Sequence, residues 1–287
     1  MKKPLKIVLI VFAALTAAAT ITLFCLYLFG DKGEKRDDVV IQPDANKIIG
    51  YDETLNIDDC SPAESLFILA GRIKNLQSYQ AAISGEVKTG IVNQEVSGAK
   101  YVTGGKSLYI SRSVSKIKQL AKQIYIQGDT VLVRNGNAKT DVYENEVARY
   151  TLSEYLNEYG NEYGNDYREL SNYTLNENTV KNATFVSVKD GLYTFEYEID
   201  VETGVNGYRV NMYKMGDLNS LPTMKKCTLT VVMTGDFLPV TVKHTDEYSV
   251  NYGITLTCKS AITETFEKIN DDSVVIPEID FFTEKSA

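Results

Sequence analysis

Residues 227–244 read CTLTVVMTGDFLPVTVKH, and this stretch decides the fold class. Apolar side chains and threonines alternate on both sides of Gly235-Asp236, a dipeptide that favours a tight hairpin turn. Side chains along a strand point alternately to the two faces of a sheet. A two-residue turn here therefore pairs apolar residues on one face: Met233 with Leu238, Val231 with Val240, and Leu229 with Val242. The stretch predicts an antiparallel hairpin with one buried face.

Two other dipeptides predict hairpins of the same kind. A turn at Gly128-Asp129 pairs Ile126 with Val131 and Ile124 with Val133. A turn at Asp190-Gly191 pairs Val188 with Tyr193 and Val186 with Phe195. Further strands rich in β-branched residues and tyrosine are expected over 79–88, 91–103, 106–113 and 118–127. The chain is therefore expected to be mainly antiparallel β.

A helix is expected ahead of the first strand. Ser61-Pro62-Ala63-Glu64 places serine at the N-cap, proline at the first helical position and glutamate where it completes a capping box. Apolar residues follow at mostly three- and four-residue spacings, which predicts a helix over 62–77. Shorter helical stretches are expected near 151–159 and 204–215. The fold class is therefore α+β.

The order of these elements resembles extracytoplasmic proteins of the LolA/LppX-like kind. The resemblance depends on the helix over 62–77, the hairpin around Gly104-Gly105, the hairpin around Gly235-Asp236 and the closing Ile276-Pro277-Glu278. It covers about residues 62–280 and is carried by turn and strand patterns. It implies a curved, open half-barrel sheet that wraps a few helices and holds an apolar cavity. It also implies a carrier, holder or sensor of lipids or lipoproteins, or a partner-binding module.

The N-terminal region contains a candidate membrane span. Residues 7–29 are 23 residues without a charge, roughly 35 Å as a helix, which is enough to cross the hydrocarbon core of a bilayer. Ala17-Ala18-Ala19 offers the alternative of a cleaved signal peptide. Cleavage there would leave a strongly apolar new N-terminus, and the apolar region is longer than signal peptides usually have. We therefore expect an uncleaved transmembrane signal anchor, in contact with the lipid bilayer through residues 7–29.

The flanks of this segment set the expected topology. Residues 1–6 hold three lysines and no acid, which favours a cytoplasmic tail. Residues 30–60 are polar and are expected to form a flexible spacer, and residues 61–287 are expected to form one extracytoplasmic domain. The predicted location is the cell membrane, with a single pass and the N-terminus inside.

Composition excludes several classes of function. The 287 residues carry 30 Lys and Arg against 38 Asp and Glu, a formal net charge of −8, which disfavours nucleic acid as a partner. The single histidine, His244, excludes histidine-rich metal sites and makes a catalytic triad depend on one residue. No pair of acids stands out from the background as glycosidase carboxylates would. We therefore expect no enzymatic activity and no cofactor.

A candidate metal site follows from the predicted strand pairing. The predicted register places Cys227 opposite His244, and a three-residue turn at 250–252 would place Cys258 opposite the same histidine. Such a row of ligands would suit zinc or copper. The alternative is that all three residues belong to the core, with the histidine bonded to a buried carbonyl. The same register places the cysteines two strand spacings apart, too far for a disulfide.

The aromatic residues suggest where a ligand could bind. The chain has 19 tyrosines, 10 phenylalanines and no tryptophan. Tyrosines on alternating strands either cover the faces and edges of a sheet or line its concave face. The candidate ligand-binding residues are Tyr101, Tyr109, Tyr125, Tyr193, Phe195 and Tyr197.

The sequence thus predicts a membrane-anchored extracytoplasmic protein that binds a hydrophobic ligand and catalyses no reaction on it. The ligand would be a lipid or the acyl chain of a lipoprotein, held in a cavity between sheet and helices. The alternative is an envelope protein-protein interaction or stress-sensing module with a filled core. In that case an exposed sheet edge or the loop 157–167 would contact an envelope protein.

Overall fold

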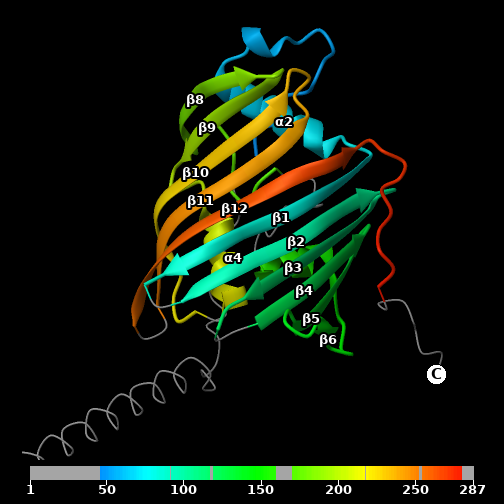
Figure 1. The fold of residues 1–287 in the computed structure, drawn as a ribbon, viewed down its shortest axis with the longest axis vertical. Helices are drawn as coiled ribbons and strands as arrows, with labels where there is room; N and C mark the ends of the chain where they lie inside the picture. The colour runs from blue at the N-terminus through cyan, green and yellow to red at the C-terminus, as the bar shows by residue number, and fades with distance from the viewer. Residues whose placement is uncertain are drawn as a thin grey trace, which may run out of the picture.

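The computed structural model describes residues 46–90, 92–116, 119–159, 170–216, 218–251 and 254–279. These residues form one twelve-stranded sheet with three α-helices beside it (Figure 1). The predicted membrane anchor at 7–29 lies outside the described residues. No helix among the residues described is both long enough and apolar enough to span a bilayer.

The elements follow in an order close to the predicted one. A short 3-10 helix, η1 (Ile57–Asp59), precedes α2 (Pro62–Lys74). The first run of strands is β1 (Ser78–Thr89), β2 (Asn93–Thr103), β3 (Lys106–Val114), β4 (Gln119–Gln127), β5 (Thr130–Asn137), β6 (Val142–Tyr143) and β7 (Ala148–Thr151). The remainder is α3 (Leu152–Tyr159), β8 (Val180–Lys189), β9 (Leu192–Ile199), α4 (Asn206–Gly216), β10 (Thr223–Thr234), β11 (Pro239–Asn251) and β12 (Thr255–Ile269).

The sheet consists of two antiparallel meanders joined through one long-range pair. The strand order is β6-β5-β4-β3-β2-β1-β12-β11-β10-β9-β8, with β7 also paired to β5. The first strand therefore pairs with the last, so that Tyr79 lies opposite Ile269 and Thr89 opposite Cys258. The edge strands β6 and β8 stay apart, and the sheet is open. This confirms the expected open, mostly antiparallel sheet with few helices.

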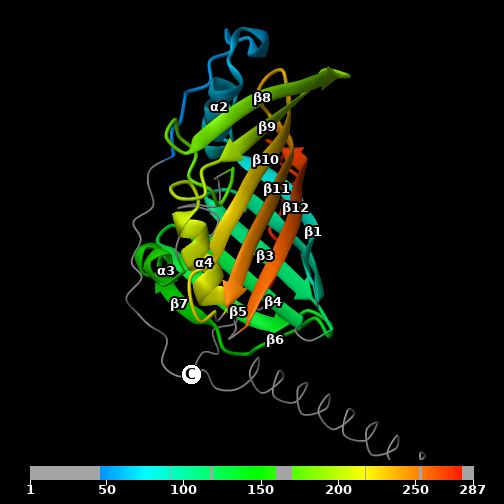
Figure 2. The ribbon, with the colours of Figure 1, turned by 90° about the vertical axis from the view of Figure 1, so that its left-hand side faces the viewer.

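The helices lie on one side of the curved sheet, which we call the inner face (Figure 2). Helix α2 begins with the predicted capping box, in which Ser61 and Glu64 exchange hydrogen bonds with each other's backbone amides. It ends at Lys74, three residues before the predicted end. Thr151 and Glu154 form a similar pair of contacts at the start of α3. Local cap chemistry thus positions two of the three helices.

Side chains alternate along each strand, so that they contribute to two apolar layers, one on each face of the sheet. On the inner face, the main core joins α2 and α4 to β9, β10 and β11, and a second cluster joins α3 to β3, β4 and β5. On the outer face, Leu108, Tyr125 and Leu132 form a smaller cluster with Ile276 and Ile279 of the C-terminal segment. The segment before α2, which we expected to be a spacer, contributes Ile57 to the main core.

Two glycines permit close contact between neighbouring strand backbones. A Cβ atom on Gly98 would lie 2.2 Å from the carbonyl oxygen of Ile110 on β3. A Cβ atom on Gly85 would lie 2.2 Å from the carbonyl oxygen of Ala261 on β12. Glycine within a strand commonly marks a bend or a close backbone approach of this kind. These two residues therefore let β1 and β2 bend where the sheet curves.

Replacing Gly98 with alanine is expected to lower the free energy of unfolding by about 1–3 kcal/mol, because the added methyl group forces a backbone shift. Gly90 is a matched control, since a Cβ atom there meets nothing within 4 Å. Gly90→Ala should change stability by less than about 0.5 kcal/mol. Urea denaturation of both variants checks the prediction. Equal stability of the two would show that the strands can move apart without cost.

The Gly235-Asp236 hairpin differs from the predicted register. The turn holds four residues between β10 and β11, so that Val231 pairs with Val242 and not with Val240. Likewise Met233 pairs with Pro239, after a bulge, and not with Leu238. The cause is Phe237, which adopts a positive φ of 55° and is completely buried against Tyr51. Burying this ring needs the longer turn, which shifts the partners of Leu229 and Val231 by two residues and leaves the faces unchanged.

The other two hairpins follow their predictions closely. Ile126 lies opposite Val131 across Gly128-Asp129, as expected. Val188 lies opposite Tyr193 across Asp190-Gly191, but a bulge then places Phe185, and not Val186, opposite Phe195. A bulge inserts one unpaired residue and shifts the register beyond it.

Candidate functional site

The six predicted ligand-binding aromatics divide between the two faces of the sheet. Tyr109, Phe195 and Tyr197 are buried on the inner face, and Tyr193 is partly buried beside them. Tyr101 and Tyr125 lie in the outer cluster. Strand alternation separates each residue from its neighbour, but it does not say which face is concave. The six residues therefore do not form one lining.

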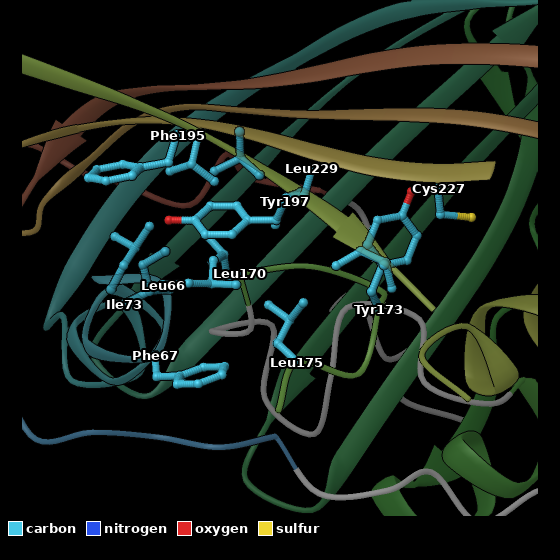
Figure 3. Close-up of a cluster of buried hydrophobic side chains, with 14 of the residues drawn as sticks. Leu66, Phe67, Ile73, Leu170, Tyr173, Leu175, Phe195, Tyr197, Cys227 and Leu229 are labelled. Carbon is cyan, nitrogen blue, oxygen red and sulfur yellow. The ribbon is translucent and has the colours of Figure 1, made fainter. Parts of the chain in front are cut away.

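Helix α2 covers the inner face of the sheet at β9. Tyr197 is completely buried, and its hydroxyl donates to the carbonyl oxygen of Pro62 at 3.0 Å. Its ring stacks on Phe195 with centroids 6.2 Å apart. Figure 3 shows both rings facing Leu66 and Ile73 of α2. Burial raises the pKa of Tyr197. These aromatics therefore form a filled core between helix and sheet.

The predicted row of Cys227, His244 and Cys258 is wrong. Cys227 pairs with Asp246, whereas His244 lies between Leu229 and Ile262. Cys258 pairs with Tyr248 and with Thr89. The longer turn at 235–238 and a four-residue difference in the β11–β12 register separate the three side chains. Throughout the part of the chain that the structure covers, no three His, Cys, Asp or Glu side chains are grouped as metal ligands.

The inner face instead contains a group of polar side chains within the apolar core. We call it the inner polar cluster. Its members come from β2, the segment before β8, α4, β10, β11 and β12: Lys100, Ser171, Tyr173, Tyr208, Cys227, His244, Asp246, Ser260 and Glu264.

Asp246 is the central acceptor of the cluster and is 2% exposed. Ser260 donates to its Oδ2 atom at 2.9 Å, and Tyr208 donates to the same atom at 3.3 Å. Tyr173 donates to Oδ1, and the Cys227 thiol also donates to the carboxylate. Burial raises the pKa of Asp246, while these donors act in the opposite direction. The carboxylate thus links Tyr173, in the segment before β8, and Tyr208 of α4 to strands β10 and β12.

The titratable donors around Asp246 are poorly suited to acid-base or nucleophilic catalysis. Burial and the nearby carboxylate raise the pKa of both Tyr173 and Tyr208 well above the usual value. The same two causes raise the pKa of the Cys227 thiol. Thiolates, and not thiols, are the reactive form of cysteine. These groups therefore act as hydrogen-bond donors that hold the segment before β8 and helix α4 on the sheet.

His244 lies two residues from Asp246 on the same face of β11. Its Nε2 atom is 2.9 Å from the Ser171 hydroxyl, and its ring meets the edge of Tyr173 at a centroid distance of 5.2 Å. Burial, assisted by the positive charge of Lys100, lowers the pKa of His244 to about 3. The imidazole is therefore neutral at neutral pH.

This lowered pKa predicts acid sensitivity of the fold. Between pH 6.5 and about pH 3, His244 binds a proton when the chain is unfolded but not when it is folded, so stability falls as the pH falls. From pH 7 to pH 5 the wild type should lose about 2 kcal/mol more than His244→Gln. Urea denaturation at the two pH values measures this difference. The same pH dependence in both proteins would contradict a neutral, desolvated imidazole.

A second pair in the cluster consists of opposite charges. The Nζ atom of Lys100 lies 2.8 Å from Oε2 of Glu264, and the two side chains are 2% and 4% exposed. Lys100 is on β2 and Glu264 on β12, with β1 between them. Lys100 pairs with Ala81 and Glu264 pairs with Ile83, so the lysine side chain crosses the strand beside a small residue. The ion pair therefore bridges the central strands.

Beyond this ion pair the inner face is only half-buried. We call this region the inner floor, and its members share the inner parity of their strands. They are Gly85, Val87, Gln94, Val96, Gly98, Ser111, Ser113, Lys122 and Ile262. Valine, isoleucine and glycine form the apolar part of the floor, with Gln94, the serines and one lysine at its polar side towards β3 and β4. The floor continues the core as a half-exposed surface.

The sequence contains a feature that indicates the inner polar cluster, and pairing the residues of the predicted hairpins does not reveal it. Lys100 shares its face with Val102, and Asp246 shares its face with Val242 and Tyr248. Glu264 likewise lies at the same parity as Phe266. A charged residue at an apolar position of an alternating strand is therefore the feature that identifies this cluster.

Comparison with known proteins gives little further information. No protein-family model and no curated protein matches the chain. Among solved structures, the crystal structure of ywiB protein from Bacillus subtilis is similar over 67% of this chain and 94% of that chain. The identity is 9% and the TM-score is 0.21. We draw no functional conclusion from a similarity at this level.

Proposed function

We propose that this protein binds an amphiphile on the inner face of its open sheet and catalyses no reaction on it. The amphiphile would be a lipid or the acyl chain of a lipoprotein. The observation that carries the proposal is the inner floor, where an apolar surface continues out of the core and stays half-exposed. A curved apolar surface next to a few polar groups is the usual form of a small-molecule site. In this proposal the aromatic residues that pack on α2 stabilise the fold, and the inner floor contacts the ligand.

The resemblance to LolA/LppX-like proteins supports this proposal at the level of architecture. An open, curved antiparallel sheet with helices on its inner face is the arrangement that the resemblance implies. Architecture alone does not confer function. The argument therefore depends on the floor and not on the family.

We also propose that residues 7–29 anchor the domain in a membrane, with residues 1–6 in the cytoplasm. The support is the length of the uncharged segment and the lysines before it. An anchored domain would lie close to a source of lipid. Alkaline extraction of membranes that contain the full chain tests the anchor, because a peripheral protein would be released.

A second candidate function is supported by strand β8. This edge strand pairs with β9 on one edge, and no described strand pairs with its other edge. Three apolar side chains on it are exposed: Phe185, Val186 and Val188. Exposed edge strands are common sites of protein association. This observation favours the alternative of a module that binds an envelope protein.

Native mass spectrometry of the full chain, purified from a bacterial host in a mild detergent, tests the ligand proposal. We expect a stoichiometric co-purifying amphiphile, identified after organic extraction. Val96→Asp, which places a charge on the floor, should lower the occupied fraction at least tenfold. Ser97→Asp is the matched control, since Ser97 points to the opposite face and is exposed. An empty chain that also takes up no added lipid would leave the partner-binding candidate.

A further inference from the structure

We propose that Lys100 recognises an anionic head group of the amphiphile, and that Glu264 occupies Lys100 in the unliganded protein. This inference rests on the proposed function and names its ligand class. The shared chemistry is a singly charged anionic head group, as found in free fatty acids and in acidic phospholipids.

The ion pair lies at the boundary between the core and the inner floor. Two residues before Lys100 on the inner face of β2 is Gly98, which is half-exposed. Two residues before Glu264 on the inner face of β12 is Ile262, which is also half-exposed. Both charges are almost completely buried, and the next inner position on each strand belongs to the floor. An amphiphile lying along the floor would therefore place one end at this pair.

Burial of these charges is a reason to look for a role beyond stability. Removing an ammonium and a carboxylate from water costs free energy that their attraction only partly recovers. A buried ion pair beside a half-exposed surface is therefore a candidate for recognition of a charged ligand. The ammonium of lysine is a compact charge with three donors, and it can accept another anion in the place of Glu264.

The neighbouring groups favour an anion over a cation. His244 is neutral at neutral pH and adds no competing charge. Asp246, the other buried acid on this face, is surrounded by the donors of Tyr173, Tyr208 and Ser260. On the floor itself, the charged side chain is Lys122. An anionic head group at the position of Glu264 would thus meet the positive charge of Lys100.

Isothermal titration of the full chain with four amphiphiles below their micellar concentrations tests the inference. The probes are dodecanoate, a dihexanoyl phosphatidylglycerol, dodecylammonium and neutral dodecyl maltoside. The wild type should bind one or both anions at least tenfold more tightly than dodecylammonium. Dodecanoate alone would indicate free fatty acids as the source, and phosphatidylglycerol alone would indicate acidic lipids.

Variants of the pair separate recognition from folding. Glu264→Gln should bind the anion several-fold more tightly, because the internal competitor is gone. Lys100→Met/Glu264→Gln removes both charges and should bind anion and cation within a factor of two. Lys88→Met/Glu86→Gln is the matched control, since this exposed pair lies on the outer face. It should keep the preference of the wild type.

The outcomes distinguish the two proposals. If the wild type binds the anions and dodecylammonium equally, or if the double variant at positions 100 and 264 keeps the preference, this inference is overturned and the proposed function survives. Binding of none of the four probes removes the proposed function, and this inference with it.

Discussion

Lys100→Met is expected to lower the free energy of unfolding by about 3–5 kcal/mol, because it leaves the carboxylate of Glu264 buried without its charged partner. A buried ion pair that loses one member keeps the desolvation cost of the other. Lys100→Met/Glu264→Leu should recover most of the loss, since an apolar pair of similar size needs no compensation there. Urea denaturation of the two variants and the wild type measures both effects.

The exposed pair of Lys88 and Glu86 is the control for this experiment. Its side chains are about half-exposed, and surface ion pairs are worth about 0–1 kcal/mol. Lys88→Met should therefore have little effect. A loss of less than about 1 kcal/mol for Lys100→Met, or a double variant no more stable than the single one, would show that water reaches the buried pair.

Tyr197→Ala is expected to destabilise the protein by about 3–5 kcal/mol, because it empties the space between β9 and α2. Tyr197→Phe keeps the ring and loses the bond to the Pro62 carbonyl, which should cost about 1 kcal/mol. Tyr101→Ala is the matched control on the outer face, where the ring is only partly buried. Thermal and urea unfolding check the order of the three variants.

The same three variants also test the location of the ligand. If Tyr197 belongs to the core and not to the binding surface, the folded fraction of Tyr197→Phe should bind an amphiphile as the wild type does. A Tyr197→Ala variant that stays as stable as Tyr101→Ala, but no longer binds the amphiphile, would reverse this assignment. It would return the ligand to the aromatic face predicted from the sequence.

The local features of the fold could be predicted because neighbouring residues specify them. The capping box at Ser61 specifies where α2 begins, and the turns at Gly128-Asp129 and Asp190-Gly191 set the register beside them. The turn at 235–238 could not be predicted in this way. Its length depends on the burial of Phe237 against Tyr51, a residue almost two hundred positions away. Tertiary burial decided between two turns that the local sequence allows.

The candidate site was less accessible to prediction than the fold. The pairing of β1 with β12 brings Lys100 and Glu264 together across 164 positions of sequence, and no local pattern encodes it. The register of β2 and β3 places Tyr101 and Tyr109 on opposite faces, but it does not say which of the two faces is inner. Alternation sorts residues into two sets, but helices α2, α3 and α4 determine which set is inner.

Photo-crosslinking with a diazirine-bearing hexadecanoic acid, followed by peptide mapping, tests the central claim that a ligand contacts the inner floor. We expect light-dependent labels in the peptides that contain Val87, Val96 and Ile262, and we expect excess dodecanoate to remove them. Val96→Asp should reduce labelling, and Ser97→Asp should not. Labels confined to β8 around Phe185–Val188, or none above the unirradiated control, would contradict the claim and favour a protein partner at the exposed edge.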